Sequence, residues 1–169
     1  MKESLVPNEE LPDMQRLISE YGSQLLRMCY LYLHDLHLAE DAVQETYIKV
    51  YKNWSSYRKD CSEKTWITAI AINVCKSYLR SSQYKHWLHS ANQNPESSYE
   101  DKIKDDTVLK EIAGLKPKYK EVILLFYYEQ LKVKEIARIL HITESAVTVR
   151  LTRAREQLKS SLKGWYFNE

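Results

Sequence analysis

Glycine and proline are scarce in this chain, whose 169 residues include 3 Gly and 4 Pro. These two residue types interrupt helices more than any others. Apolar residues recur at helical spacing along most of the sequence. The scarcity of helix breakers and this periodicity together predict an all-α protein.

Cysteine is also sparse, and nothing in the sequence has the spacing of a metal site. Cys29, Cys61 and Cys75 are odd in number and are not spaced as metal ligands. They fit a reduced cytosolic protein with partly buried thiols. His86 and His89 could share a helix face, but no acidic or cysteine partner lies near them in the sequence. We therefore expect no metal and no other cofactor.

Long apolar runs are missing as well. No stretch reaches the roughly 18 consecutive apolar residues of a membrane-spanning helix, and the first residues lack a signal-peptide pattern. We expect a soluble, cytoplasmic protein with no direct membrane insertion.

The net charge of +2 conceals an uneven distribution of charge along the chain. Residues 1–48 contain 3 Lys or Arg and 9 Asp or Glu, whereas residues 49–87 contain 8 and 2. Residues 88–131 contain 6 basic and 8 acidic residues, and residues 132–169 contain 8 basic and 4 acidic residues. Two basic blocks separated by an acidic stretch predict two contacts with a polyanion, and a different partner for the acidic N-terminal part.

The segment KVKEIARILHITESAVTVRLTRAREQL, residues 132–158, has the pattern of a helix-turn-helix. Its first helix places Val133, Ile136, Ala137 and Leu140 on one apolar face. Thr143 can cap the second helix, because its hydroxyl can accept a free backbone N–H there.

The second helix of this segment is apolar on one side and basic on the other. Val147, Leu151, Ala154 and Leu158 lie within roughly 60° of one another at about 100° per residue, and therefore face the core. The outward side is polar and rich in arginine, as contact with base edges and phosphates requires. The pattern predicts a helix that enters the major groove of DNA.

The rest of the chain divides into two units. Helices at about 12–34, 38–54 and 64–82 carry apolar residues at helical spacing, and three such helices can bury one core. In the first of these helices the apolar residues include Leu17, Ile18 and Leu25. We assign residues 12–83 to this first domain.

A polar segment containing NQNPESS follows, and we predict that residues 84–106 form a flexible linker. The second domain is assigned to residues 107–165. It begins with a short helix at 108–115, continues with a helix from Pro117 to about Tyr128, and ends with the helix-turn-helix.

Four segments together resemble the extracytoplasmic-function (ECF) sigma factors, the smallest members of the sigma-70 class. The resemblance covers roughly residues 15–82 and 107–162. It implies a region-two helical bundle and a region-four helix-turn-helix domain joined by a flexible linker. In chain order the segments are AEDAVQETYIKVYK (39–52), TWITAIAINVCKSYLR (65–80), LKPKYKEVILLFYYEQLKVKEIA (115–137) and SAVTVRLTRAREQL (145–158).

The resemblance implies a polymerase contact in the first segment. In the family this segment docks on the clamp helices of the largest subunit of core RNA polymerase, and the flap of the polymerase is a further contact. The matching residues here are Asp41, Gln44 and Glu45, which lie on neighbouring positions of one helix.

The second segment would bind the −10 promoter element, where one base of the non-template strand is flipped into a pocket. Asn73 matches the family's asparagine at this pocket and offers donors and acceptors for a base edge. Tyr57, Arg58 and Lys64 would lie in or beside the loop that faces the base. Lys76 and Arg80, one turn apart, would meet phosphates.

The fourth segment would recognise the −35 element in the major groove. Glu144, Ser145, Thr148 and Val149 lie at the start of the recognition helix. Arg150, Arg153 and Arg155 are candidates for phosphate or guanine contacts, and the sequence does not divide these two roles among them.

Several positions depart from the family pattern. Ile72 and Lys120 stand where the family usually has arginine, and Ser77 replaces a frequent acidic residue. His141 lies where glycine is common in the turn, and Ser145 with Ala146 replaces Gly-Thr. These changes are compatible with the fold, but they leave the promoter preference open.

We expect an alternative sigma factor that binds core RNA polymerase and directs it to promoter DNA with −35 and −10 elements, without being an enzyme itself. The family further implies an anti-sigma factor, expected to be membrane-bound, that covers the polymerase-binding surfaces. One alternative is an autonomous helix-turn-helix regulator, but no heptad pattern for dimerisation is present. A small helical nuclease is a weaker alternative, because the basic blocks contain few acids.

Overall fold

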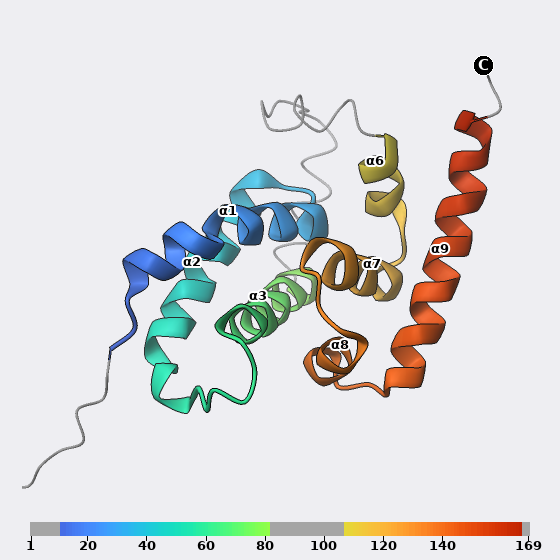
Figure 1. Ribbon diagram of the computed structural model, residues 1–169. Coiled ribbons are helices and arrows are strands. Elements are labelled where there is room, and N and C mark those ends of the chain that lie inside the picture. The colour runs from blue at the N-terminus through green and yellow to red at the C-terminus, as the bar shows by residue number, and fades with distance from the viewer. Residues whose placement is uncertain (1–10, 82–106, 167–169) are drawn as a thin grey trace, which may run out of the picture.

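The computed structural model describes residues 11–81 and 107–166, in which every regular element is a helix (Figure 1). The all-α prediction is therefore confirmed. The predicted linker at 84–106, with His86 and His89, lies outside the described residues. The N-terminal unit consists of α1 (Met14–Leu33), α2 (Leu36–Lys52), the 3-10 turn η1 (Trp54–Ser56) and α3 (Glu63–Arg80). The C-terminal unit consists of α6 (Thr107–Gly114), α7 (Pro117–Ile123), the π-helical turn η2 (Leu124–Tyr128), α8 (Val133–Leu140) and α9 (Glu144–Tyr166).

Side-chain caps define where the three long helices of the N-terminal unit begin. Asp13 accepts the backbone N–H of Arg16 at 3.0 Å, and Asp35 accepts that of Leu38 at 2.6 Å. Ser62 accepts the backbone N–H of Thr65 at 3.0 Å. Each cap satisfies a donor that the first turn of a helix leaves free, and typically stabilises the helix by about 1 kcal/mol.

The core of this unit lies where α1, α2 and α3 meet. Leu17, Leu33, Val50 and Ile67 are almost fully buried there. Ile18, which the periodicity also assigned to the apolar positions of α1, is instead 49% exposed. A buried leucine or isoleucine contributes about 1.5–3 kcal/mol relative to an exposed one, so the buried positions account for the packing of the three helices.

The C-terminal unit contains the predicted helix-turn-helix. Ile136, Ala137 and Leu140 of α8 are buried, and Val147 and Leu151 of α9 pack against them. The Thr143 hydroxyl accepts the backbone N–H of Ala146 at 3.1 Å, which confirms the predicted cap. The preceding helix starts at Pro117 as predicted, but its last residues, Leu124–Tyr128, form a π-helical turn.

The two units pack directly against each other, which the sequence did not predict. Helix α1 contacts α6, α7 and η2, and one cluster of buried apolar side chains includes residues of both units. The side-chain amide of Gln24 donates to the carbonyl oxygen of Tyr128 at 2.7 Å across this contact. Figure 1 shows α7 and α8 next to the bundle formed by α1–α3, with α9 on the outer side.

The turn of the helix-turn-helix contains a strained residue. His141 follows α8 with φ of 54° and ψ of 45°, the left-handed conformation that glycine adopts without steric cost. A non-glycine residue in this region costs about 1–2 kcal/mol, and glycine returns part of this through its greater freedom in the unfolded chain.

We therefore predict that His141→Gly raises the free energy of unfolding by about 0.5–1 kcal/mol. Urea denaturation followed by circular dichroism measures the change. His141→Ala is the matched control, because alanine removes the imidazole but retains the left-handed strain. An equal gain in both variants would contradict the explanation by backbone strain.

Candidate polymerase and DNA interfaces

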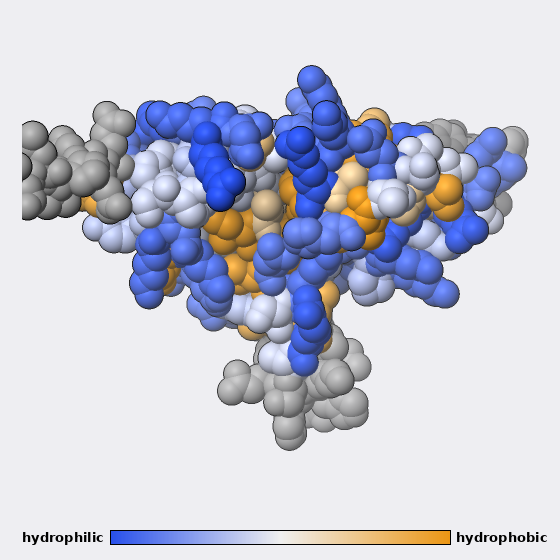
Figure 2. Space-filling model, turned by 90° about the horizontal axis from the view of Figure 1, so that it is seen from below, coloured by the Kyte–Doolittle hydropathy of each residue, from blue (hydrophilic) through white to orange (hydrophobic). Residues whose placement is uncertain are grey.

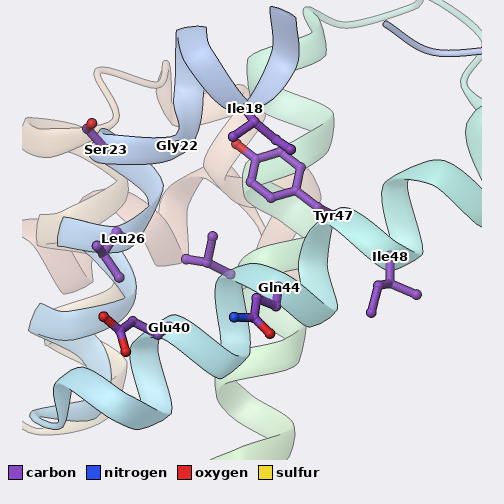
Figure 3. A pocket seen from close by; sticks show the side chains of 9 residues that line it. Ile18, Gly22, Ser23, Leu26, Glu40, Gln44, Tyr47 and Ile48 are labelled. Carbon is purple, nitrogen blue, oxygen red and sulfur yellow. The ribbon is translucent and has the colours of Figure 1, made fainter. Parts of the chain in front are cut away.

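The predicted polymerase-binding residues lie on α2, but they do not all point the same way. Asp41 and Gln44 are exposed, and Gln44 lines a groove between α1 and α2 (Figure 3). Glu45 is half-buried on the side toward α3, where its carboxylate accepts the Tyr78 hydroxyl at 3.0 Å. The same carboxylate lies 3.3 Å from the ammonium group of Lys49. Asp41 and Gln44 are thus available to a partner, whereas Glu45 also joins α2 to α3.

The groove beside Gln44 has a volume of about 650 Å³ and is largely apolar. Ile18 and Leu26 of α1 lie along one side of it, and Ile48 of α2 lies along the other (Figure 3). Ile18 and Ile48 are about half exposed, at 49% and 54%. Sequence reasoning missed this groove, although Ile48 lies one turn after Gln44 on the same helix.

The loop predicted to face the −10 base is held by aromatic packing. The Tyr57 ring lies 5.1 Å from that of Trp66 and 5.5 Å from that of Trp54, measured between centroids. The Tyr57 hydroxyl donates to the carbonyl oxygen of Cys61 at 2.6 Å. These contacts fix the loop and leave Arg58 exposed beside it.

The remaining −10 candidates lie along α3 in two different environments. Asn73 and Arg80 are exposed. Asn73 lines a pocket of about 220 Å³ whose other wall is formed by α8, with Arg138 and Ile139. Lys64 and Lys76 are only 28% and 24% exposed, because both contact acidic residues of the C-terminal unit.

These two lysines bind glutamates that the sequence analysis did not single out. Lys64 donates to the backbone carbonyl of Glu129 at 2.7 Å, and its ammonium lies 3.8 Å from the carboxylate of that residue. The ammonium of Lys76 lies 3.0 Å from the carboxylate of Glu121. No local pattern could indicate these pairs, because their members are 45 or more positions apart in the sequence.

The −35 candidates form the exposed start of α9. Glu144, Ser145, Thr148 and Val149 are all exposed, and Val149 is 47% exposed although it is apolar. The Thr148 hydroxyl donates to the carbonyl oxygen of Glu144 at 3.0 Å within the helix. Figure 2 shows the face of the molecule seen from below, where hydrophilic side chains surround smaller hydrophobic areas.

The three arginines of α9 differ in their surroundings. Arg153 is exposed. Arg150 lies 3.0 Å from the carboxylate of Glu121. Arg155 donates to the Tyr127 hydroxyl at 2.8 Å, and its guanidinium stacks over the rings of Tyr127 and Phe126. The three arginines, which the sequence left equivalent, therefore have different surroundings: Arg153 and Arg155 are exposed, and Arg150 and Arg155 contact other side chains of the chain.

Two of the departures from the family pattern have structural explanations. Ile72 is fully buried in the apolar cluster, where an arginine would have to lose its hydration. Lys120 is buried as well, and its ammonium lies 2.7 Å from Nε2 of His34 at the end of α1.

Comparison with protein-family models and with known proteins shows the family of this chain. Residues 17–84 match sigma-70 region 2, and residues 105–158 match sigma-70 region 4. Over 147 residues the chain is 31% identical to the ECF RNA polymerase sigma factor SigM of Bacillus subtilis, with 83% of this chain and 89% of SigM covered. The chain belongs to the extracytoplasmic-function (ECF) sigma factors.

A further relative agrees with this membership, and two solved structures have a similar fold. The sigma factor is 28% identical over 163 residues to SigW of Bacillus subtilis, with 87% of both chains covered. Its fold resembles that of the sigma factor RpoE from Bartonella quintana, solved with the anti-sigma factor NepR, with a TM-score of 0.72 at 19% identity over 89% of this chain and 97% of that one. CnrH, solved with the cytosolic domain of CnrY, gives a TM-score of 0.69 at 19% identity, with 89% of this chain and 88% of CnrH covered. The protein is an alternative sigma factor, which directs core RNA polymerase to promoters by recognising −35 and −10 elements.

None of the sigma factor's helices in residues 11–81 and 107–166 is long and apolar enough to span a membrane. Within the same residues, no group of three or more His, Cys, Asp or Glu is arranged to hold a metal ion.

Several ionisable groups of the sigma factor are buried where its two units meet, and burial shifts their pKa values. Burial raises the pKa of Glu129 to about 7, although the nearby Lys64 ammonium and a hydrogen bond from Thr68 lower it. Within the described part of the chain, Oε1 of Glu129 has no hydrogen-bond partner. Burial also lowers the pKa of Lys120 to about 8.

His34 beside Lys120 is neutral near pH 7. Although His34 is partly exposed, desolvation of its ring and the adjacent ammonium lower its pKa to about 4, and a hydrogen bond with the backbone of Ala113 opposes this shift. The Lys120 ammonium therefore donates to the unprotonated Nε2 of His34.

Glu129 makes the stability of the sigma factor depend on pH. Between about pH 4.5 and pH 7 the folded chain keeps a proton on this carboxyl group that the unfolded chain releases. The contribution of Glu129 to stability therefore falls as the pH rises through this window, by up to about 3 kcal/mol.

We predict that Glu129→Gln, which stays neutral, has nearly wild-type stability at pH 5 and is more stable than the wild type by about 1–3 kcal/mol at pH 8. Urea denaturation of both proteins at the two pH values measures the difference and cancels the titration of other groups. A variant that is less stable than the wild type at pH 8 would show that the ion pair with Lys64 outweighs the cost of burial.

Proposed function

We propose that Asp41, Gln44 and Glu45 bind the clamp helices of the largest subunit of core RNA polymerase. The exposure of Asp41 and Gln44, and the acidity of the N-terminal part of the chain, support this assignment. The groove beside Gln44 adds an apolar surface, with Ile18 and Ile48, that an apolar side chain of the partner helix can fill. The charged and polar residues of α2 would then fix the orientation of the clamp helices, while the groove would add buried apolar surface to the interface.

The −10 element would be bound by α3 and the loop before it. Asn73 would accept and donate hydrogen bonds to the flipped base, beside the packed aromatic rings of Tyr57 and Trp66. Arg58, Lys64, Lys76 and Arg80 would contact the backbone of the non-template strand. Such contacts with phosphates are electrostatic and do not depend on the DNA sequence. Asn73 and the loop would therefore provide the selectivity for the −10 sequence.

The −35 element would be recognised by the start of α9 in the major groove. The observation that carries the proposal is that only one side of this helix is buried. Val147, Leu151 and Ala154 lie on the buried side, and the opposite face is exposed. On the exposed face, Glu144, Ser145, Thr148 and Val149 would meet base edges. Arg153 would contact a phosphate or a guanine, and Arg150 and Arg155 would join it once they leave their present partners.

Each unit alone would bind its DNA element weakly. Core polymerase would bind the N-terminal unit through its clamp helices and the C-terminal unit through its flap. It would thereby fix the spacing of the two units. The second contact then forms at a high effective concentration, and the two affinities act together. The sigma factor would leave after initiation and would catalyse no step itself.

Regulation would come from an anti-sigma factor that covers the polymerase-binding surfaces. The sigma factor RpoE from Bartonella quintana, which has a similar fold, was solved in complex with the anti-sigma factor NepR, and this supports the expectation. We further propose that the anti-sigma factor is bound to the membrane, so that an event at the envelope releases a sigma factor that acts in the cytoplasm.

The proposed function is tested by run-off transcription with purified bacterial core polymerase on a promoter library, with and without this protein. We expect start sites that depend on the protein and share two spaced elements. Transcripts from no template, together with a duplex footprint of the protein alone, would instead favour an autonomous regulator.

The polymerase contact gives a separate prediction. Replacing Asp41 and Gln44 together by alanine should weaken binding to core polymerase at least tenfold, about 1.4 kcal/mol, while the fold is retained because both side chains are exposed. Fluorescence anisotropy of labelled sigma factor titrated with core polymerase measures the affinity. Glu20→Ala is the control, since Glu20 is an exposed acid of α1 that does not line the groove. Equal affinities of the double variant and this control would refute the assignment to α2.

A further inference from the structure

One exposed side chain of the proposed recognition helix is apolar. Val149 lies on the opposite side of α9 from Val147, Leu151 and Ala154, which are buried in the core, at about 100° per residue. Among the side chains of α9 that the structure describes, at 144–163, no other large apolar side chain is exposed. Val149 therefore lies at the centre of the face that is proposed to meet DNA.

The residues around Val149 are not those that favour a helix. Thr148, Val149 and Thr152 are β-branched, and all three are exposed. A β-branched side chain loses rotamer freedom in a helix, so alanine, lysine or glutamate would stabilise these positions better. Packing within the chain does not account for the three residues either, because it leaves them exposed. A partner that contacts this face accounts for them.

The two threonines use their hydroxyl hydrogens within the helix. The Thr148 hydroxyl donates to the carbonyl oxygen of Glu144, and the Thr152 hydroxyl donates to that of Thr148, both at 3.0 Å. Each threonine therefore offers a partner only an acceptor oxygen and a methyl group. The side chain of Val149 has no hydrogen-bonding group. The surface formed by Thr148, Val149 and Thr152 thus presents methyl groups and no hydrogen-bond donor.

Only one of the four bases offers an apolar group to such a surface. In the major groove guanine presents acceptors, cytosine presents a donor, and adenine presents one of each, whereas thymine presents an acceptor and its C5 methyl group. A valine against a polar base edge would remove water from that edge without replacing the hydrogen bond. A valine against the thymine methyl group buries apolar surface of both partners. The chemistry of Val149 therefore selects thymine.

We propose that Val149 reads the C5 methyl group of a thymine in the −35 element, so that an A·T pair belongs to the promoter sequence that this sigma factor prefers. The inference rests on the proposed entry of α9 into the major groove, and adds the base pair that one residue selects. Arg153 is exposed one turn after Val149 on the same face. Its contact with a guanine or a phosphate would hold the helix beside the thymine.

The test uses the sigma factor with core polymerase, on the promoter that gives the strongest protein-dependent transcript in the library. A second template replaces every thymine of the −35 element, on both strands, by deoxyuridine, which pairs in the same way but lacks the methyl group. The two templates give run-off transcripts of different lengths and compete for limiting holoenzyme. We expect the thymine template to be transcribed about fourfold more, the effect of burying one methyl group.

Val149→Ala should abolish this preference. Alanine leaves the space of the two valine methyl groups empty, and it favours the helix, so the fold is retained. We expect the variant to transcribe the two templates within about 1.5-fold of each other. Gln157→Ala is the matched control, because Gln157 is exposed on α9 but lies to the side of the face centred on Val149. This control should keep the preference of the wild type.

A third template controls for the effect of deoxyuridine on the DNA itself. It carries the same number of deoxyuridines in the spacer between the two elements, and should compete equally with the thymine template. An equal disadvantage of both deoxyuridine templates would overturn the proposal, because the preference would then come from the DNA and not from Val149.

The remaining outcomes separate this inference from the function on which it rests. No protein-dependent transcript from any template would refute the proposed function, and the inference with it. Protein-dependent transcription with no thymine in the −35 element, or with no preference for thymine over deoxyuridine, would overturn the inference alone. A preference that persists in Val149→Ala would also overturn it, because another residue would then read the methyl group.

Discussion

The buried carboxylate of Glu121 is the interaction on which the arrangement of the two units depends. It contacts α3 through Lys76 and α9 through Arg150, while its own helix, α7, packs on α1 and α9. A carboxylate removed from water is unfavourable unless it is paired. With the two cations on either side its charge is compensated, and the two helical units are brought together around it.

The remaining contact between the units contains groups whose burial is less well compensated. Burial raises the pKa of Glu129, whose Oε1 has no hydrogen-bond partner among the described residues. Burial lowers the pKa of Lys120, whose ammonium lies 2.7 Å from Nε2 of His34. Each of these groups weakens the packing that the apolar side chains favour.

Local sequence patterns predicted the elements of the fold well. Helical periodicity and few helix breakers indicated the all-α class, and the Thr143 cap and the buried face of α9 were confirmed. These features depend on residues within about two turns of one another, which is the range that periodicity reports. The family membership followed from four such segments in order, and the comparisons with known proteins confirmed it.

Contacts between distant residues could not be predicted in this way. The pairs Lys76–Glu121 and Lys64–Glu129 join residues that are far apart in the chain, and many surface arrangements of these charges fit the same sequence. The exposure of Ile18 and Ile48 was missed for a related reason, because periodicity identifies an apolar face but not whether another helix covers it. The predicted roles of Arg150 and Arg155 stay open, since the structure gives both residues partners within the chain.

The most direct test of this account is the distance between the two units in the free and the polymerase-bound protein. Fluorophores on cysteines introduced at Ser55 and Lys159, which are both exposed, would report it by single-molecule energy transfer, with Cys61 replaced by serine and the buried Cys29 and Cys75 retained. The account predicts high transfer efficiency in the free sigma factor and a clear fall when core polymerase is added. The same efficiency in both states would contradict it.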